Sequence, residues 1–432
     1  MADGNEALFA RVAQELPIEL LRIPSGSQHN GWVVPDNWRV VSCQIWQDGH
    51  LIFDGAGQSL CVGYYSKSFK GDLSWEELDQ HLVTNPDLPD GYMFHCEWQY
   101  RPWAAEWIIS MPYSIYSTLG EGIYHVELRT ETSVGEMLMG VCDKRGSSTK
   151  TIVLNSNNCH PHMANDGFAG TAVLIRLMQW LMKMETYYSY RFLIAPEHLG
   201  SVFYLAQLSV KDLDDIVACI FEEMPGTQGP LVATSTFLGG SDLDLAVANA
   251  LKHHTNAFEI AAWRKGAGND ETVWEAPGYE IPCVELTRRE SQFAPYREYH
   301  SSLDRPELMD EARLNEVFVV LQETIQSLEN NVSVTRTFDG LPCLSNPQYD
   351  LYMERFDPTV NKALPEDSEK WGHLLDSLLR YFDGKISILE IAERHELPFT
   401  ELREYVQKLV ESGLTHVHRV ELEPPRPARV TK

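Results

Sequence analysis

Residues 151–170 have the sequence TIVLNSNNCHPHMANDGFAG, in which an apolar run is followed by a long polar segment. The first four residues are β-branched or leucine, which predicts a buried strand. From Thr171 to Glu185 apolar residues recur at helical spacing, so a helix follows. The polar residues between the two elements therefore occupy a loop at the carboxyl end of a strand, where open α/β sheets collect ligands and catalytic groups.

This loop carries several of the side chains that bind zinc in proteins. It contains two histidines, a cysteine and an aspartate, of which His160 and Asp166 are the first candidates. An ordinary alternative is a polar turn in which Asp166 caps the following helix. Cys159 fits either a zinc ligand or a buried structural thiol.

The composition excludes some classes of protein. With 432 residues the chain is too long for one ordinary core, so we expect two or three domains. A net charge of -27 argues against nucleic acid or an anionic membrane as partner, because phosphate binding needs clustered Lys and Arg. The eight cysteines are scattered, and neither a signal peptide nor a membrane span is evident. We therefore expect a cytoplasmic protein that binds neither nucleic acid nor a membrane.

Strands and helices alternate between residues 150 and 329, which predicts an α/β domain whose parallel or mixed sheet is covered by helices on both faces. The expected strands lie at 151–156, 190–195, 231–236 and 281–286. Short β-rich runs before residue 141 indicate an inserted β-rich domain. Its aromatics Trp98, Trp103 and Trp107 could line a substrate cleft, although such residues more often lie in a core or an interface.

The tail from Trp371 to Val420 shows three helical apolar faces and a final alternating segment, which indicates a winged-helix-like domain. Its third helix lacks a basic face, so we interpret the domain as a packing or oligomerisation module and expect a homo-oligomer. The predicted boundaries are 1–30 for the N-terminal part of the main domain, 31–145 for the insert, 146–345 for the α/β domain, 346–366 for a linker and 367–432 for the winged-helix-like domain.

Three motifs together resemble a known family. They are Cys159-His160-Pro161 with Ala164-Asn165-Asp166, Phe192 to Glu197 with Gly200-Ser201, and Tyr299-His300-Ser301-Ser302-Leu303-Asp304. This combination is similar to a bacterial family of predicted zinc aminopeptidases with an inserted domain of unknown function and a C-terminal winged helix. That family belongs to the superfamily of bacterial leucyl aminopeptidase, zinc carboxypeptidase and glutaminyl cyclase. The resemblance spans nearly the whole chain and implies a phosphorylase/hydrolase-like zinc-peptidase sheet.

The resemblance also implies roles for individual residues. Asp166 matches an aspartate that bridges both zinc ions in two-metal members, and His300 matches a late histidine ligand. Glu197 matches the general base, and Asp270 matches an acidic residue beside the site. We choose His160 as the third ligand. Zinc lowers the pKa of bound water to about 7, and a nearby carboxylate can then accept its proton.

Departures from the family pattern favour one zinc ion over two. Asn157 stands where the family usually has a histidine, and amides are poor zinc ligands. The segment 237–240 stands where two-zinc peptidases carry an acidic ligand, so Asp242 either takes that role from a displaced position or simply starts a helix. His198 replaces a glutamate that is frequent in the superfamily, and it would either bind zinc or support a ligand.

The sequence thus predicts a zinc-dependent hydrolase of an amide bond. It would be aminopeptidase-like and act on a small peptide or aminoacyl conjugate, in a role such as specialised metabolism. Two alternatives remain open at this stage. One is a single-zinc acyltransferase or cyclotransferase on the same fold, and the other is a metal-free binding or scaffold protein that has lost catalysis.

Overall fold

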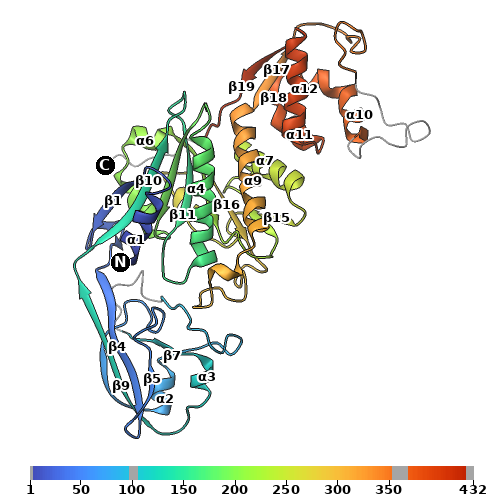
Figure 1. Ribbon diagram of the computed structural model, residues 1–432. Coiled ribbons are helices and arrows are strands. Elements are labelled where there is room, and N and C mark those ends of the chain that lie inside the picture. The colour runs from blue at the N-terminus through green and yellow to red at the C-terminus, as the bar shows by residue number, and fades with distance from the viewer. Residues whose placement is uncertain (1–2, 97–105, 353–367, 425–432) are drawn as a thin grey trace.

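The computed structural model describes residues 3–96, 106–352 and 368–424. Figure 1 shows a central α/β body, a β-rich unit at its lower end and a helical C-terminal unit at its upper right. None of the helices in the described ranges combines the length and apolarity that a membrane crossing requires. The central body holds the predicted site, and both other units pack against it.

An eight-stranded mixed sheet forms the central body. Four neighbouring strands run parallel to one another and make up the middle of the sheet: β12 (Ser189–Ala195), β11 (Thr151–Asn157), β13 (Ile216–Glu223) and β16 (Cys283–Arg288). At one edge β10 (Glu136–Lys144) pairs antiparallel to β12, and β1 (Glu19–Pro24) pairs antiparallel to β10. At the other edge β14 (Leu231–Thr234) pairs antiparallel to β16, and the outermost β15 (Phe258–Ala261) pairs parallel to β14. The predicted mixed α/β sheet is confirmed.

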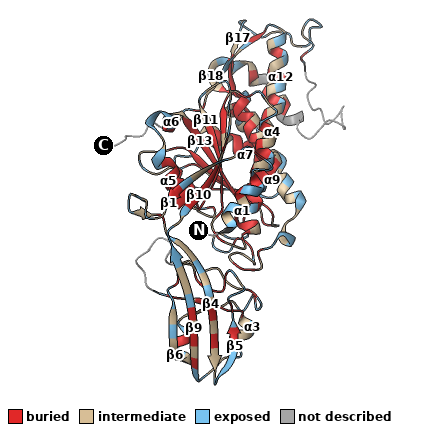
Figure 2. Ribbon diagram, turned by 60° about the vertical axis from the view of Figure 1, so that its left-hand side comes forward, coloured by how far each residue is buried: buried red, intermediate tan, exposed pale blue. Residues whose placement is uncertain are grey.

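Side-chain alternation along β11 explains why helices cover both faces of the sheet. Ile152 and Leu154 pack with apolar residues of α4 (Gly170–Leu181) in one core cluster, whereas Val153 packs into the cluster of the opposite face. The first face carries α1 (Asp3–Val12), α4, α7 (Asp242–His254) and α9 (Glu311–Asn330), and the second carries α5 (Leu199–Gln207), α6 (Val210–Asp215) and α8 (Glu271–Trp274). Figure 2 shows the resulting concentration of buried residues in the central body.

The structure differs from the predicted strand list in two ways that affect the site. β13 was not predicted, although Ile216 to Phe221 is an apolar run of the same kind as the start of β11. β14 runs antiparallel to β16. The loop that follows β14 therefore lies toward the amino-terminal ends of β11, β12 and β13, away from their carboxyl ends. The segment 237–240 is therefore remote from the predicted zinc ligands.

The β-rich unit is a four-stranded sheet with a small core of its own. Its strands are β5 (His50–Asp54), β4 (Asn37–Gln47), β9 (Ile123–Ser133) and β6 (Phe69–Ser74), and Ser74 caps α2 (Trp75–Asp79) in a capping box with Glu77. Trp107 is buried and stacks on Phe69 and His81, so it belongs to this core. Trp98 and Trp103 lie outside the described residues. β10, predicted within the insert, pairs with β1 and β12 in the central sheet.

Three short elements complete this region: two-stranded pairs β2 (Gln28–His29) with β3 (Trp32–Val33), β7 (Leu82–Val83) with β8 (Ile109–Ser110), and the single-turn helix α3 (Tyr113–Tyr116). The β7–β8 pair and α3 lie within the insert, between α2 and β9.

The C-terminal unit contains the predicted three helices and terminal strand. They are α10 (Ser368–Ser377), α11 (Ile388–Arg394), α12 (Phe399–Glu411) and β19 (Thr415–Arg419), joined by β18 (Asp383–Ser387). A strand from residues assigned to the α/β domain, β17 (Val332–Arg336), lies between β18 and β19, so the unit begins near residue 332. The Asn249 side chain on α7 fixes the unit by hydrogen bonds to the backbone of Leu397 and Phe399. Most of the predicted linker lies outside the described residues.

Candidate metal and active site

The loop between β11 and α4 holds Asp166 in a tightly defined turn. Gly167 has a φ of 121°, and a Cβ there would lie 2.1 Å from the Asn157 Oδ1 atom, so this turn requires glycine. The Asp304 carboxylate accepts the backbone N–H groups of Asn165 and Asp166 at 2.9 and 3.1 Å. Asp304 is buried and also accepts the Tyr296 hydroxyl at 3.0 Å. The motif around His300 therefore supports the turn that carries Asp166.

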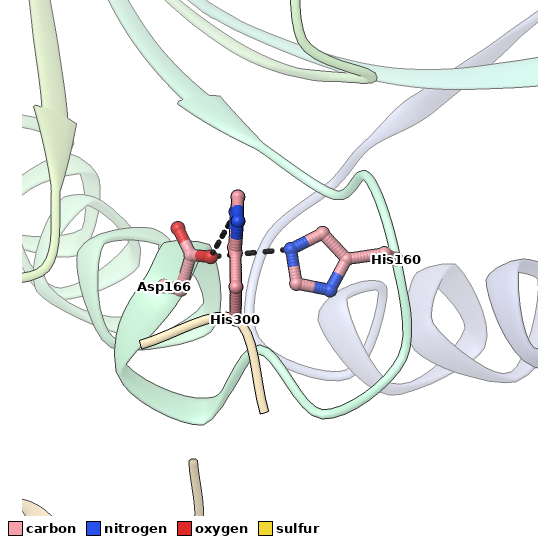
Figure 3. Close-up of side chains that lie close together, drawn as sticks. All are labelled: His160, Asp166 and His300. Atoms are coloured by element: carbon pink, nitrogen blue, oxygen red, sulfur yellow. Dashed lines mark hydrogen bonds and ion pairs between the residues drawn. The ribbon is translucent and has the colours of Figure 1, made fainter. Parts of the chain in front are cut away.

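Three of the predicted ligands lie together beside the sheet edge (Figure 3). The Nε2 atoms of His160 and His300 lie 3.1 and 3.3 Å from Asp166 Oδ2. The three potential ligand atoms lie within 4.8 Å of one another. His160 and Asp166 are buried, whereas the His300 side chain is 37% exposed, so the cluster is open to solvent on the His300 side.

The orientation of His160 suits a metal ligand. Its Nδ1–H donates to the Pro161 carbonyl at 2.8 Å, which leaves Nε2 facing Asp166. Burial disfavours protonation of His160, but the hydrogen bond and the charges of Asp166 and Glu197 outweigh burial and raise its pKa. Burial likewise opposes ionisation of Asp166, yet the two histidines lower the pKa of this carboxyl. Two imidazole nitrogens and a carboxylate oxygen are a donor set that zinc accepts, so the residues fit this metal.

Glu197 and His198 follow the carboxyl end of β12. The Glu197 backbone N–H donates to Cys159 Sγ at 3.0 Å, so this cysteine anchors the turn, and burial raises the pKa of its thiol well above the usual range. The Glu197 carboxylate lies 3.4 Å from His198 Nε2 and is 32% exposed. Cys159 thus remains a thiol that supports Glu197, and Glu197 keeps an accessible carboxylate near the cluster.

Asp270 is fully buried and supports the turn after β12. It accepts the His198 backbone N–H at 2.6 Å and the Asn155 amide at 3.0 Å, and it also accepts the Ser201 hydroxyl. Burial raises the pKa of this carboxyl, and the positive character of His198 together with the hydrogen bonds offsets part of the effect. Asp270 therefore lies beside the site, as predicted, with its oxygens already satisfied by these donors.

Asp242 does not join the cluster. It occupies the first turn of α7 after the N-cap Ser241, and it lines a surface cavity with Val217 and Arg419. Val217 is near the start of β13, so Asp242 lies at the amino-terminal ends of the middle strands, whereas Asp166 lies at their carboxyl ends. Of the two roles open for Asp242, the structure shows the start of a helix, and the direction of β14, which leads to it, takes it away from Asp166.

Glu223 is an acidic residue near the cluster that the sequence reasoning missed. It ends β13, is buried, and accepts the side-chain amides of Asn157 and Asn269 at 3.3 and 2.8 Å. Burial raises the pKa of Glu223 well above its usual range, and the charges of Glu285, Asp166 and Glu197 add to the effect. The apolar run of β13 with acidic residues at its carboxyl end was the signal that could have revealed it.

A second missed residue, Phe94, reaches the cluster from the β-rich unit. Its ring stacks on His160 with centroids 4.0 Å apart and meets His300 edge-on at 5.0 Å. Aromatic residues are common in both units, so no sequence pattern marked this one.

Residues 1–331 match the model of the family described as "Domain of unknown function (DUF4910)". The chain belongs to this family. The DUF4910 match ends at Asn331, directly before β17, so the C-terminal unit follows the matched range.

This DUF4910 chain is similar over most of its length to a Clostridium acetobutylicum protein and to a crystal structure from the same organism. A Clostridium acetobutylicum protein described as "Putative polysaccharide biosynthesis protein with aminopeptidase-like domain" is 26% identical over 396 residues, which cover 91% of this chain and 87% of the relative. The crystal structure of a putative peptidase from Clostridium acetobutylicum matches with a TM-score of 0.78 at 23% identity and covers 96% of this chain and 92% of that one.

The structure of BSAP, a zinc aminopeptidase from Bacillus subtilis, matches with a TM-score of 0.57 at 12% identity over 76% of this chain and 89% of that one. Similarity at such identities establishes the fold. The DUF4910 chain therefore has an aminopeptidase-like fold, and the resemblance to the zinc aminopeptidases is confirmed at that level.

Proposed function

We propose that the protein is a zinc-dependent hydrolase of an amide bond, with an aminopeptidase-like activity on a small peptide or aminoacyl conjugate. The observation that carries the proposal is the cluster of His160, Asp166 and His300 within 4.8 Å, with Glu197 on the neighbouring strand end. Three protein ligands and an open side are typical of catalytic zinc sites. The donor set supports one zinc ion rather than two. Asn157 stands where the resembled family usually has a histidine, and its amide donates to Glu223. An amide is a poor zinc ligand.

Bound zinc would lower the pKa of a water molecule and polarise the scissile carbonyl. The protein's own groups supply the remaining steps. Glu197 accepts the proton of the attacking water on its carboxylate and delivers it to the departing amine. Cys159 accepts the Glu197 N–H and Asp270 accepts the His198 N–H, so the backbone that carries the Glu197 carboxylate is held in place before the substrate arrives.

The substrate class follows from how the β-rich unit meets the cluster. Phe94 contacts both histidines, and Gln58 of the same unit hydrogen-bonds His162 at 2.9 Å, so this unit borders the site on the loop side. A site bordered in this way suits a small amide better than a folded protein. A single-zinc acyltransferase or cyclotransferase would use the same groups, with an amine of a substrate in place of water.

Metal analysis of purified protein tests the proposal. We expect about one zinc ion per chain, lost in His300→Ala and retained in His254→Ala, a control at the end of α7 that pairs with Glu323. Hydrolysis of aminoacyl amides should cease with a chelator and return with zinc. No zinc after reconstitution would contradict the proposal and favour a scaffold protein, whereas cyclised or transferred products would favour the transferase.

A further inference from the structure

The β-rich unit contacts the candidate ligands with both its backbone and a side chain. The Phe94 N–H donates to the His300 carbonyl at 2.7 Å, and the Ser302 N–H donates to the Tyr92 carbonyl at 2.8 Å. Met93 and Ser301 form an antiparallel bridge between these two hydrogen bonds. Residues 92–94 thus pair as a short ladder with residues 300–302, the segment that carries His300.

Further contacts fix this ladder on each side. The Ser302 hydroxyl accepts the Tyr92 N–H at 3.0 Å, and the Ser110 hydroxyl, which belongs to the core of the β-rich unit, accepts the Met93 N–H at 2.6 Å. His300 has a φ of 53°, a conformation that costs free energy in a residue with a Cβ. The ladder is well placed to hold the His300 backbone in this conformation.

The Phe94 ring fixes the two imidazoles relative to each other. It lies 4.0 Å from the His160 ring at an interplanar angle of 19°, and it meets the His300 ring at 70°. The two imidazoles are themselves nearly perpendicular, at 82°. Tyr299 stacks on His300 at 3.8 Å from the side of the main domain. Rotation of either histidine would therefore break an aromatic contact with Phe94.

We propose that the inserted β-rich unit is an integral part of the metal site, with the 92–94 segment holding the His300 backbone and Phe94 acting as a positioning residue for both histidines. The inference rests on the proposed zinc site. It makes metal binding and docking of the unit reciprocal, because a contact that favours the metal-competent arrangement must itself be favoured by the metal.

The test compares zinc affinity and cobalt(II) spectra of the wild-type protein with those of Phe94→Ala and Phe94→Leu. Leucine fills much of the space of the Phe94 ring but has no aromatic plane. A loss of affinity in Phe94→Leu is therefore not explained by an unfilled cavity. Groups that orient metal ligands contribute about 10- to 100-fold to affinity, so we expect zinc binding to weaken by that factor in both variants. The visible spectrum of the cobalt(II) protein, which reports coordination geometry, should change as well.

Tyr113→Ala is the matched control, because Tyr113 is a half-buried aromatic of the same unit that stacks on Tyr116 in α3. It should leave affinity and spectrum unchanged. In the wild-type protein, zinc should also slow hydrogen exchange of the Phe94 and Ser302 amides.

Equal affinity and identical spectra in wild type and both Phe94 variants would overturn the inference while leaving the zinc site intact. Unchanged amide exchange on zinc addition would overturn the reciprocal link. A wild-type protein that binds no zinc would overturn the proposed function and this inference together, so the two failures are distinguishable.

Discussion

The Asp304 carboxylate accepts the backbone N–H of Asp166 at 3.1 Å, although the two residues are far apart in the sequence. One acidic residue thereby positions another that is a candidate metal ligand. Asp304 closes the motif that begins at Tyr299, whereas Asp166 follows β11. This contact joins two of the three motifs on which the family resemblance rests.

Asp304→Asn should therefore weaken both the fold and the metal site. The amide would direct N–H groups at one of the two backbone donors, and loss of a hydrogen bond to a charged group costs about 1.5–3 kcal/mol. Urea unfolding would measure the loss of stability, and zinc titration would measure the loss of affinity. Asp310→Asn is the control, since Asp310 caps α9 and should affect stability alone. Wild-type zinc affinity in Asp304→Asn would contradict this role.

Glu197→Gln should separate metal binding from catalysis. The amide cannot accept a proton, so we expect turnover to fall about 10²- to 10⁴-fold, the usual contribution of a general base. Zinc content should stay at the wild-type level, because His160, Asp166 and His300 are untouched. The measurement is kcat on an aminoacyl amide together with metal analysis of the same preparation. Full activity in this variant would assign the base elsewhere.

Much of the site was predictable because it depends on local patterns. The strand and helix around residues 151–181 follow from apolar periodicity, and this places Asp166 in a loop at the carboxyl end of a strand. His160 and His300 were chosen in part by family resemblance. The structure brings both to Asp166.

The remaining features depend on tertiary structure. The direction of β14 is set by how the chain crosses the sheet, and residues 231–236 contain no signal for it, so the sequence could not decide between a ligand and the start of a helix for Asp242. Phe94 contacts His160 and His300 only because the β-rich unit packs against the central body. No local sequence pattern indicates this packing. Glu223 is different, because the apolar run of β13 was visible in the sequence and was overlooked.

Glu275 should make stability depend on pH. Burial raises the pKa of this carboxyl from 4.5 to about 7, although the Phe237 and Cys283 N–H groups donate to it. The folded protein thus holds a proton here that the unfolded chain releases at lower pH. The contribution of protonated Glu275 to the free energy of unfolding is therefore fully present below pH 4.5 and is lost as the pH rises through about 7.

Glu275→Gln removes this ionisation and keeps an oxygen acceptor. Relative to the wild type, the variant should therefore gain about 1 kcal/mol of stability on going from acidic to mildly alkaline pH, after allowance for screening by water. Urea unfolding of both proteins at about pH 5 and about pH 8 would measure the difference. If the variant and the wild type differed in free energy of unfolding by the same amount at both pH values, Glu275 would have an ordinary pKa.

Gly167→Ala should damage the turn that carries Asp166. The alanine Cβ would lie 2.1 Å from Asn157 Oδ1 and 2.3 Å from Met163 Cε, and the φ of 121° is unfavourable for alanine. We expect a loss of about 2 kcal/mol or more, as for other changes that strain the backbone. Zinc affinity should fall as well, because the strained turn is the one that carries Asp166.

Gly57→Ala is the matched control, because a Cβ at that position meets nothing within 4 Å. Its effect on stability should stay within about 0.5 kcal/mol. Urea unfolding and zinc titration of both variants make the comparison. If Gly167→Ala lost stability but kept zinc affinity, the turn would be a feature of the fold and the position of Asp166 would not depend on it. Parallel losses, absent in Gly57→Ala, would show that the glycine is needed because it lets Asp166 reach His160 and His300.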